Sequence, residues 1–326
     1  MKRPIYTPSL NLKKVTQRLT KEHKMLTEAW GNDSAYFFTR NREFTRGIGN
    51  HSTTLKVPQS IPFIILPYYN GTNLEKYLSE QIRHRRVHTT RTPAKKQQDK
   101  ITGLQMSFAI TKVMTHLHNQ GIIHCDFKPD NCLVTLPISD NAPCFPVMPI
   151  DLGYSLKSSP LEPHSEQSLN GTPGYIAPEL LQAGSLPYST TSDCYAVGLT
   201  LIQILDALQF FKHSLHFLEI GQSASLSYDT VYKHARGIQD TLHKEAKHHT
   251  NDPTAHRLCE LLGRTVAIDP AERPPLEELS DCLQTLLREQ GHEMHGNWAP
   301  PPAPAHFPRH YSESVATAVA SPTPTP

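Results

Sequence analysis

The sequence predicts an α+β protein with two parts, a small N-terminal part that contains β-strands and a larger C-terminal part that is mostly helical. The 326 residues exceed the roughly 150 that one domain usually takes, which suggests two domains or one domain with two lobes. The first sixty residues have a mixed pattern, whereas apolar residues after position 100 recur at helical spacing. A chain of this length can bury a sizeable core without disulfide or metal staples.

Charge balance and cysteine usage narrow the class of protein. The chain has 32 Lys and Arg against 30 Asp and Glu, a net charge of +2, so we expect no nucleic acid as partner. Its six cysteines form no C-x-x-C pair, which indicates reduced thiols in the cytoplasm or nucleus. No apolar run approaches the roughly 18 residues of a membrane span, and no apolar region follows the N-terminal charges. We therefore expect neither a membrane segment nor a secretory signal.

Several elements can be read in chain order. The apolar run 61–66 ends at Pro67 and predicts a short buried strand. Residues 101–118 have apolar side chains at helical spacing, and Gly121 then ends the predicted helix. Residues 196–208 are nearly all apolar, which is typical of a helix that is buried on most sides.

The remaining segments differ in polarity. Residues 255–266 and 276–287 are amphipathic and predict two helices. The segment 83–100 has seven Lys or Arg and a single acid, Asp99. It predicts an exposed loop between two helices, and a role in nuclear import or in binding acidic substrates is compatible with that loop. Residues 291–326 predict a disordered tail, because eight prolines occur in the last 31 positions. An SH3-like partner could dock on this tail.

The strongest chemical signal is the sequence H-C-D-F-K-P-D-N at 124–131. Phosphoryl transfer needs the three residue types that this loop combines: an Asp for the proton of the attacking hydroxyl, a Lys for the charge of the γ-phosphate, and an Asn oxygen for magnesium. Twenty residues later, the D-L-G triplet 151–153 offers a second oxygen ligand and a glycine that permits a sharp bend.

Three further segments follow in order: G-T-P-G-Y-I-A-P-E at 171–179, Asp193, and D-P-A-E-R-P at 269–274. In this order and at these separations the sequence resembles the eukaryotic-type serine/threonine protein kinase family, over roughly residues 9–290. The resemblance implies a kinase-like two-lobed fold. Residues 1–66 would form a reduced, β-containing N-lobe, 67–74 the hinge and 75–290 the mostly helical C-lobe.

The resemblance also implies a role for each matching residue. Asp126 matches the catalytic base and Lys128 the lysine of the same loop, while Asn131 and Asp151 match the residues that bind Mg²⁺. Lys128 together with Thr172 resembles serine/threonine kinases rather than tyrosine kinases. ATP would then be the phosphate donor, and Ser or Thr hydroxyls of protein substrates would be the acceptors.

Outside the reacting groups, Glu179 and Arg273 match the buried ion pair that braces the activation segment, and Asp193 matches the acid that holds the backbone of the catalytic loop. Leu152 stands where phenylalanine is usual and keeps an apolar plug. Cys125 replaces an arginine that in much of this family pairs with a phosphorylated activation loop. A neutral thiol cannot form that charge-assisted bond, so we expect activity that does not depend on activation-loop phosphorylation.

The N-terminal part resembles the family less. Segment 10–15 resembles the strand that carries the lysine for the α- and β-phosphates of ATP, which would be Lys13; the alternative is an ordinary exposed lysine. Glu22, with Leu26 one turn later, would be its partner on the next helix. Only nine residues precede this strand, too few for two glycine-rich strands, so either the lobe is reduced or the start lies upstream.

At the hinge, the residues that bind the adenine of ATP would be Leu66, Pro67 and Tyr69. Pro67 keeps the carbonyl that accepts the adenine amine, and Tyr69 still has an N–H to donate. An altered H-x-D element with a reduced N-lobe is similar to divergent kinases, including those of large DNA viruses.

Two alternatives to an active protein kinase stay open. A catalytically weak or inactive pseudokinase scaffold would explain the lack of glycine-rich strands, because these strands cover the phosphates and exclude water. A small-molecule phosphotransferase would share the Asp and Asn chemistry, but it has no need for the segment 171–179, which positions a peptide hydroxyl.

Overall fold

The computed structural model describes residues 12–31, 36–38, 44–48, 51–55, 63–65, 71–87, 92–135, 147–158, 171–182, 187–211 and 227–292. Nearly all of the predicted tail 291–326 and the predicted hinge residues Leu66, Pro67 and Tyr69 lie outside these ranges.

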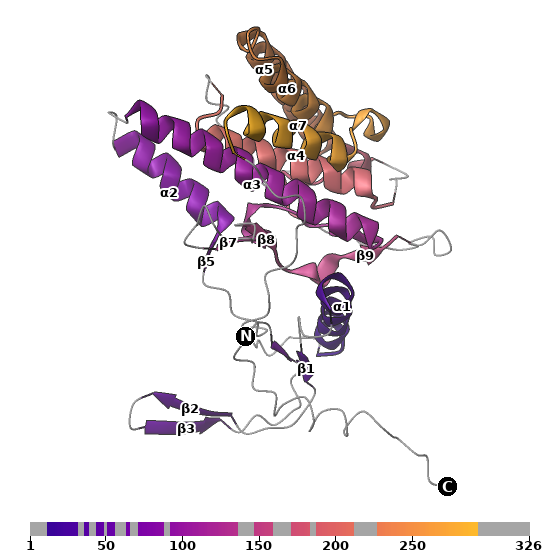
Figure 1. The fold of residues 1–326 in the computed structure, drawn as a ribbon. Coiled ribbons are helices and arrows are strands. Elements are labelled where there is room, and N and C mark those ends of the chain that lie inside the picture. The colour runs from indigo at the N-terminus through magenta and orange to yellow at the C-terminus, as the bar shows by residue number, and fades with distance from the viewer. Residues whose placement is uncertain are drawn as a thin grey trace.

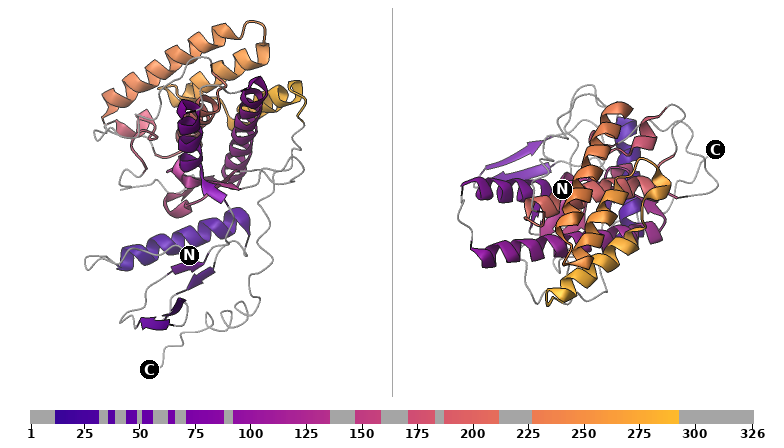
Figure 2. Two further views of the ribbon diagram at one scale, coloured as in Figure 1. Left: turned by 90° about the vertical axis from the view of Figure 1, so that its left-hand side faces the viewer. Right: turned by 90° about the horizontal axis from the view of Figure 1, so that it is seen from above.

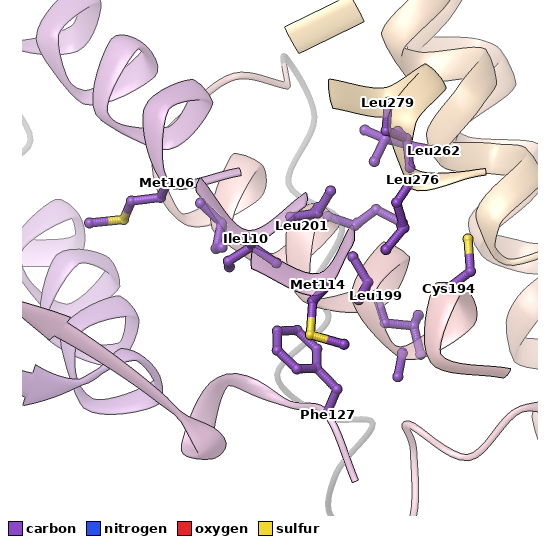
Figure 3. Packing of buried hydrophobic residues seen from close by; sticks show 14 of the residues in the cluster. Met106, Ile110, Met114, Phe127, Cys194, Leu199, Leu201, Leu262, Leu276 and Leu279 are labelled. Carbon is purple, nitrogen blue, oxygen red and sulfur yellow. The ribbon is translucent and has the colours of Figure 1, made fainter. Parts of the chain in front are cut away.

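Most of the described chain is helical, and the helices from α2 onward gather in one lobe (Figure 1). They are α2 (Leu74–Val87), α3 (Pro93–Asn119), α4 (Thr190–Ala207), α5 (Tyr228–His248), α6 (Pro253–Thr265) and α7 (Leu276–Glu289). Side chains of α3, α4, α6 and α7 meet in one apolar cluster (Figure 3). The helices predicted at 101–118, 196–208, 255–266 and 276–287 are thus confirmed. None of the described helices is long and apolar enough to cross a membrane.

Polar caps fix where two of these helices begin. The side chain of Thr92 accepts a hydrogen bond from the backbone N–H of Lys95 at 3.2 Å, and proline follows at the first helical position of α3. At the start of α4, Ser189 and Ser192 each accept a bond from the other's backbone N–H. The second cap places Asp193 in the first turn of a helix that is buried on most sides.

The strands form small antiparallel sheets. In the N-terminal part, β1 (Tyr36–Phe38) pairs with β4 (Phe63–Ile65), and β2 (Phe44–Ile48) forms a hairpin with β3 (His51–Leu55). Next to the helical lobe, β7 (Cys132–Thr135) lies between β5 (Gly71–Asn73) and β8 (Val147–Pro149). The strand predicted at 61–66 is therefore confirmed, and so is the two-lobed α+β architecture with its reduced sheet part.

The predicted strand at 10–15 is wrong, because helix α1 (Leu12–Trp30) includes Lys13. Its buried apolar residues Leu19, Leu26 and Ala29 recur at helical spacing. A helix buries these three side chains on one face, which a strand would not do. Figures 1 and 2 show α1 below the helical lobe, near β9 (Leu156–Lys157) and β1.

The basic segment 83–100 is also corrected. Its residues 83–87 belong to the end of α2 and its residues 93–100 to the start of α3. Arg85 donates to the carbonyls of Asp206 at 2.6 Å and Ala207 at 3.2 Å, which lie at the C-terminal end of α4. Lys95 pairs with buried Asp99 at 2.9 Å. Arg85 and Lys95 therefore stabilise the packed helices.

Candidate active site

The loop that carries the predicted catalytic residues is anchored at its start and in its middle. It follows β6 (Ile122–Ile123), which pairs antiparallel with β9 so that Ile123 faces Leu156. Figure 3 shows Phe127 of the loop beside Met114 of α3, and both side chains are buried. The apolar core thus holds the polar loop against the helical lobe.

Asp193 holds the backbone at the start of this loop. One carboxylate oxygen accepts hydrogen bonds from the N–H of His124 at 2.7 Å and from the ring Nε2 of His118 at 3.1 Å. The other oxygen accepts from the N–H of Cys125 at 3.0 Å. Cys125 has a φ of 65°, in the left-handed region that residues other than glycine seldom adopt. Bonds to a buried carboxylate are strong, so Asp193 stabilises the turn that presents Asp126.

The predicted catalytic residues Asp126, Lys128 and Thr172 lie together in one hydrogen-bonded chain. Lys128 Nζ donates to the hydroxyl of Thr172 at 2.6 Å, and this hydroxyl donates to Asp126 Oδ1 at 2.8 Å. Gly171 makes the approach possible, because its φ is +115° and an added Cβ would lie 3.2 Å from the carbonyl oxygen of Cys125. The activation segment and the catalytic loop therefore meet at Thr172.

Asn131 is oriented by Asp126. Its amide Nδ2 donates to the backbone carbonyl of Asp126 at 2.7 Å and to Asp126 Oδ2 at 3.2 Å. With the nitrogen directed to Asp126, the amide oxygen faces the other way and can act as an acceptor or ligand. The carbonyl of Asn131 accepts from the N–H of Ile150 at 2.8 Å. This bond places Asp151, the next residue, beside Asn131.

The bend predicted at Gly153 lies two residues earlier, at Asp151. Asp151 has φ 66° and ψ 66°, and its side chain accepts from the backbone N–H of Gly153 at 3.4 Å. Asp tolerates the left-handed conformation better than most residues, since its short side chain can bond locally. Leu152 is fully buried, in keeping with the predicted apolar plug. The backbone of Asp151 is thus fixed on both sides.

Asn131 and Asp151 offer the donor atoms that a magnesium ion prefers. Both would present oxygen ligands, one from an amide and one from a carboxylate, and Mg²⁺ in nucleotide sites usually takes one or two carboxylates together with phosphates and water. Asn131 immediately precedes β7 and Asp151 lies two residues after β8, so both residues flank the same end of this antiparallel strand pair. These residues fit the metal that the kinase resemblance implies.

Two buried side chains beside Asp126 are held uncharged. Burial lowers the pKa of His124, although the nearby carboxylates of Asp193, Asp126 and Asp151 act in the opposite direction. Burial also raises the pKa of the Cys125 thiol well above its ordinary value. Among the residues that the structure describes, neither ring nitrogen of His124 has a hydrogen-bond partner. Position 125 therefore provides no positive charge.

Glu22 and Lys13 are not brought together. Both lie on α1, and nine residues of helix separate them by about 14 Å along the axis and by half a turn. Glu22 is buried. The proposed pairing of the two residues is therefore wrong, because it required Lys13 on a separate strand facing the helix.

Three residues that sequence reasoning missed lie against the D-L-G segment or the catalytic loop. Arg18 and Lys21 of α1 contact Tyr154, which follows Gly153. His118, at the end of α3, bonds to Asp193. The signal for Arg18 and Lys21 was their spacing of three residues on a helix face, and it becomes visible only once 12–30 is read as helical.

Comparison with known proteins supports the same reading. The family described as protein kinase domain matches residues 49–283, which is more than half of the chain. Serine/threonine-protein kinase dkf-1 of Caenorhabditis elegans is 30% identical over 169 residues, which cover 52% of this chain and 20% of that protein.

Two further relatives are serine/threonine kinases by name. Serine/threonine-protein kinase PAK 5 of Rattus norvegicus is 36% identical over 98 residues, which cover 30% of this chain and 12% of that protein. Serine/threonine-protein kinase D3 of Homo sapiens is 27% identical over 186 residues, or 56% of this chain and 18% of that protein. The matched regions thus span a fifth or less of the length of these relatives.

Proposed function

The chain belongs to the protein kinase family, and we propose that it is an active enzyme that transfers the γ-phosphoryl group of ATP to serine and threonine hydroxyls of proteins. The observation that carries this proposal is the chain of hydrogen bonds from Lys128 through Thr172 to Asp126, with bond lengths of 2.6 and 2.8 Å. It joins a cation, a hydroxyl and a carboxylate at the loop that the family uses for phosphoryl transfer.

Each residue of the site has a defined task in this proposal. Asp126 orients the substrate hydroxyl and accepts its proton, while the charge of Lys128 stabilises the negative charge that builds on the transferred phosphoryl group. Asn131 and Asp151 would hold Mg²⁺, which when bound neutralises charge on the phosphate oxygens. Thr172 keeps Asp126 and Lys128 at fixed positions, so that little reorganisation is needed at the moment of reaction.

The alternative is a pseudokinase scaffold with weak or no transfer activity. The correction at Lys13 favours it, because the lysine that was expected to bind the α- and β-phosphates lies in helix α1. The retention of Asp126, Lys128, Asn131 and Asp151 favours the active enzyme, because a scaffold has no need for all four. We give the second argument more weight, since it concerns the reacting groups themselves.

A transfer assay with radiolabelled ATP and generic basic proteins separates the two proposals. We expect label on protein with the wild-type chain and a loss of about 10²- to 10⁴-fold with Asp126→Asn. Asp130→Asn is the matched control, because it makes the same chemical change at an exposed position of the same loop. Equal labelling by the wild type and Asp126→Asn would contradict an active kinase.

The substrate class is tested in the same assay. Label on protein supports a protein kinase, for which the segment 171–179 would hold the peptide hydroxyl near Asp126. Label found on small metabolites and never on protein would instead support a small-molecule phosphotransferase.

A further inference from the structure

Arg18 of helix α1 contacts two residues of the segment 151–154, which begins with Asp151. The guanidinium carbon of Arg18 lies 4.0 Å from the ring centroid of Tyr154, and its Nη1 donates to the Tyr154 hydroxyl at 3.1 Å. Its Nη2 lies 3.6 Å from Asp151 Oδ1. One side chain therefore touches both the residue that would bind the metal and the tyrosine three positions later.

The turn at Gly153 is shaped to admit this arginine. A Cβ on Gly153 would lie 2.8 Å from Arg18 Nε and 3.4 Å from Arg18 Nη2. Any other residue at this position would displace the guanidinium. The glycine of the triplet thus allows the close approach of Arg18, while the left-handed backbone belongs to Asp151.

Two more cation contacts fasten α1 to the same segment. Lys21, on the same helix face as Arg18, donates to the backbone carbonyl of Tyr154 at 3.4 Å. Lys157 of β9 pairs with Glu28 near the end of α1 at 2.8 Å. Arg18 is therefore held at its position by the docking of the whole helix, and its 3.6 Å ion pair with Asp151 is longer than its 3.1 Å hydrogen bond to Tyr154.

We propose that Arg18 is a positioning residue that holds the Asp151 carboxylate in the orientation needed for metal binding. This inference rests on the proposed function, since it assigns Asp151 to the metal. The carboxylate of Asp151 can rotate about its side-chain bonds. The planar guanidinium of Arg18, which is held by Tyr154, limits this rotation through its contact with Oδ1. Tyr154 in turn fixes the guanidinium by its hydroxyl and its ring face.

A competing effect has the opposite sign. The positive charge of Arg18 repels a divalent cation at Asp151, so electrostatics alone predicts tighter metal binding when the charge is removed. Arg18 is 43% exposed, which screens this repulsion, and orientation should dominate. Arg18→Lys separates the two effects, because lysine keeps the charge but has neither the planar fork nor its stacking geometry.

The test measures binding of Mn²⁺ by water proton relaxation, in the presence of a non-hydrolysable ATP analogue and without turnover. We expect Arg18→Met and Arg18→Lys both to weaken Mn²⁺ binding about fivefold or more, a coupling of ordinary size. Lys24→Met is the matched control, since it removes an exposed cation from the same helix. In the transfer assay the metal concentration for half-maximal rate should rise, while the KM for the protein substrate stays unchanged.

The outcomes are distinguishable. Wild-type binding that is lost in Asp151→Asn but unchanged or tighter in Arg18→Met would overturn the role of Arg18 and leave the proposed function standing. Failure of the wild type to bind Mn²⁺ with the analogue would overturn both. Thermal unfolding of each variant shows whether α1 stays docked, and weaker binding in a variant of unchanged melting temperature supports the proposal.

Discussion

Glu179 and Arg273, which lie 94 positions apart, form a bidentate ion pair inside the helical lobe, with N···O distances of 2.7 and 2.6 Å. The Arg273 side chain is fully buried and that of Glu179 is 7% exposed. Arg273 also donates to the carbonyls of Thr191 and Ala267, and its guanidinium carbon lies 5.1 Å from the ring centroid of Tyr195. The pair ties the end of the activation segment to the starts of α4 and α7.

Breaking this pair from one side should destabilise the protein strongly. Arg273→Ala leaves a buried carboxylate without its partner, which typically costs about 3–5 kcal/mol of unfolding free energy. The double variant Glu179→Ala with Arg273→Ala should cost less than the sum of the single variants, because no lone charge remains. Urea unfolding of the four proteins measures the coupling. Additive losses would show that the pair is not coupled in the folded state.

The three bonds of Asp193 predict a local effect on the catalytic loop. Asp193→Asn replaces an acceptor oxygen with an amide nitrogen that faces an N–H, so at least one bond to His124 or Cys125 must break. Hydrogen exchange at one or both of these amides should become at least about tenfold faster, since one bond to a charged group is worth roughly 1.5–3 kcal/mol. Asp240→Asn, at an exposed position of α5, is the control. Unchanged exchange would contradict the role assigned to Asp193.

Much of the helical lobe could be predicted from sequence because its helices bury continuous apolar faces. Residues 196–208 have only three polar side chains in thirteen positions, and the segment 255–266 has the period of a helix rather than that of a strand. Helix α1 was missed because charged residues separate Leu19, Leu26 and Ala29, and because a six-residue resemblance at 10–15 outweighed that weaker period. The loop predicted at 83–100 failed similarly, since helix caps such as Thr92 decide where α3 begins.

The candidate site contains both residues that could be predicted from local sequence and contacts that could not. Asp126, Lys128 and Asn131 lie within six residues of each other, so their spacing alone was enough to predict that they act together. Arg18 and Tyr154 are separated by 136 positions, and their contact exists only because α1 docks on the segment 151–154. No local pattern encodes such a tertiary contact.

The replacement of the loop arginine by Cys125 gives a prediction about regulation. Cys125 is 8% exposed, and its thiol donates to the backbone carbonyl of Ile123 at 3.5 Å. A neutral thiol forms no charge-assisted bond with a phosphate. Each of the single variants Ser158→Asp, Ser159→Asp, Ser165→Asp and Ser168→Asp should therefore keep a turnover within about twofold of the wild type. Steady-state kinetics of the four Ser→Asp variants check this. A severalfold rise in any of them would contradict it.

Buried His124 predicts how stability depends on pH. Burial lowers its pKa in the folded protein below the ordinary value of 6.5 that it regains on unfolding. The unfolded chain therefore binds a proton more readily, so the stabilising effect of neutral His124 is complete above about pH 6.5 and is lost as pH falls toward the folded pKa. While pH lies between the two pKa values, the loss approaches about 1.4 kcal/mol per pH unit.

The variant His124→Leu isolates this effect from the other titrating groups. It removes the proton-binding site while it fills the same apolar space beside Phe127. As pH falls from 7.5 to 5.5, the unfolding free energy of the wild type should therefore decrease more than that of the variant. His243→Leu, which removes an exposed imidazole from α5, is the matched control and should show no such trend. Parallel pH profiles for wild type and His124→Leu would mean that Asp193, Asp126 and Asp151 offset the burial of the ring completely.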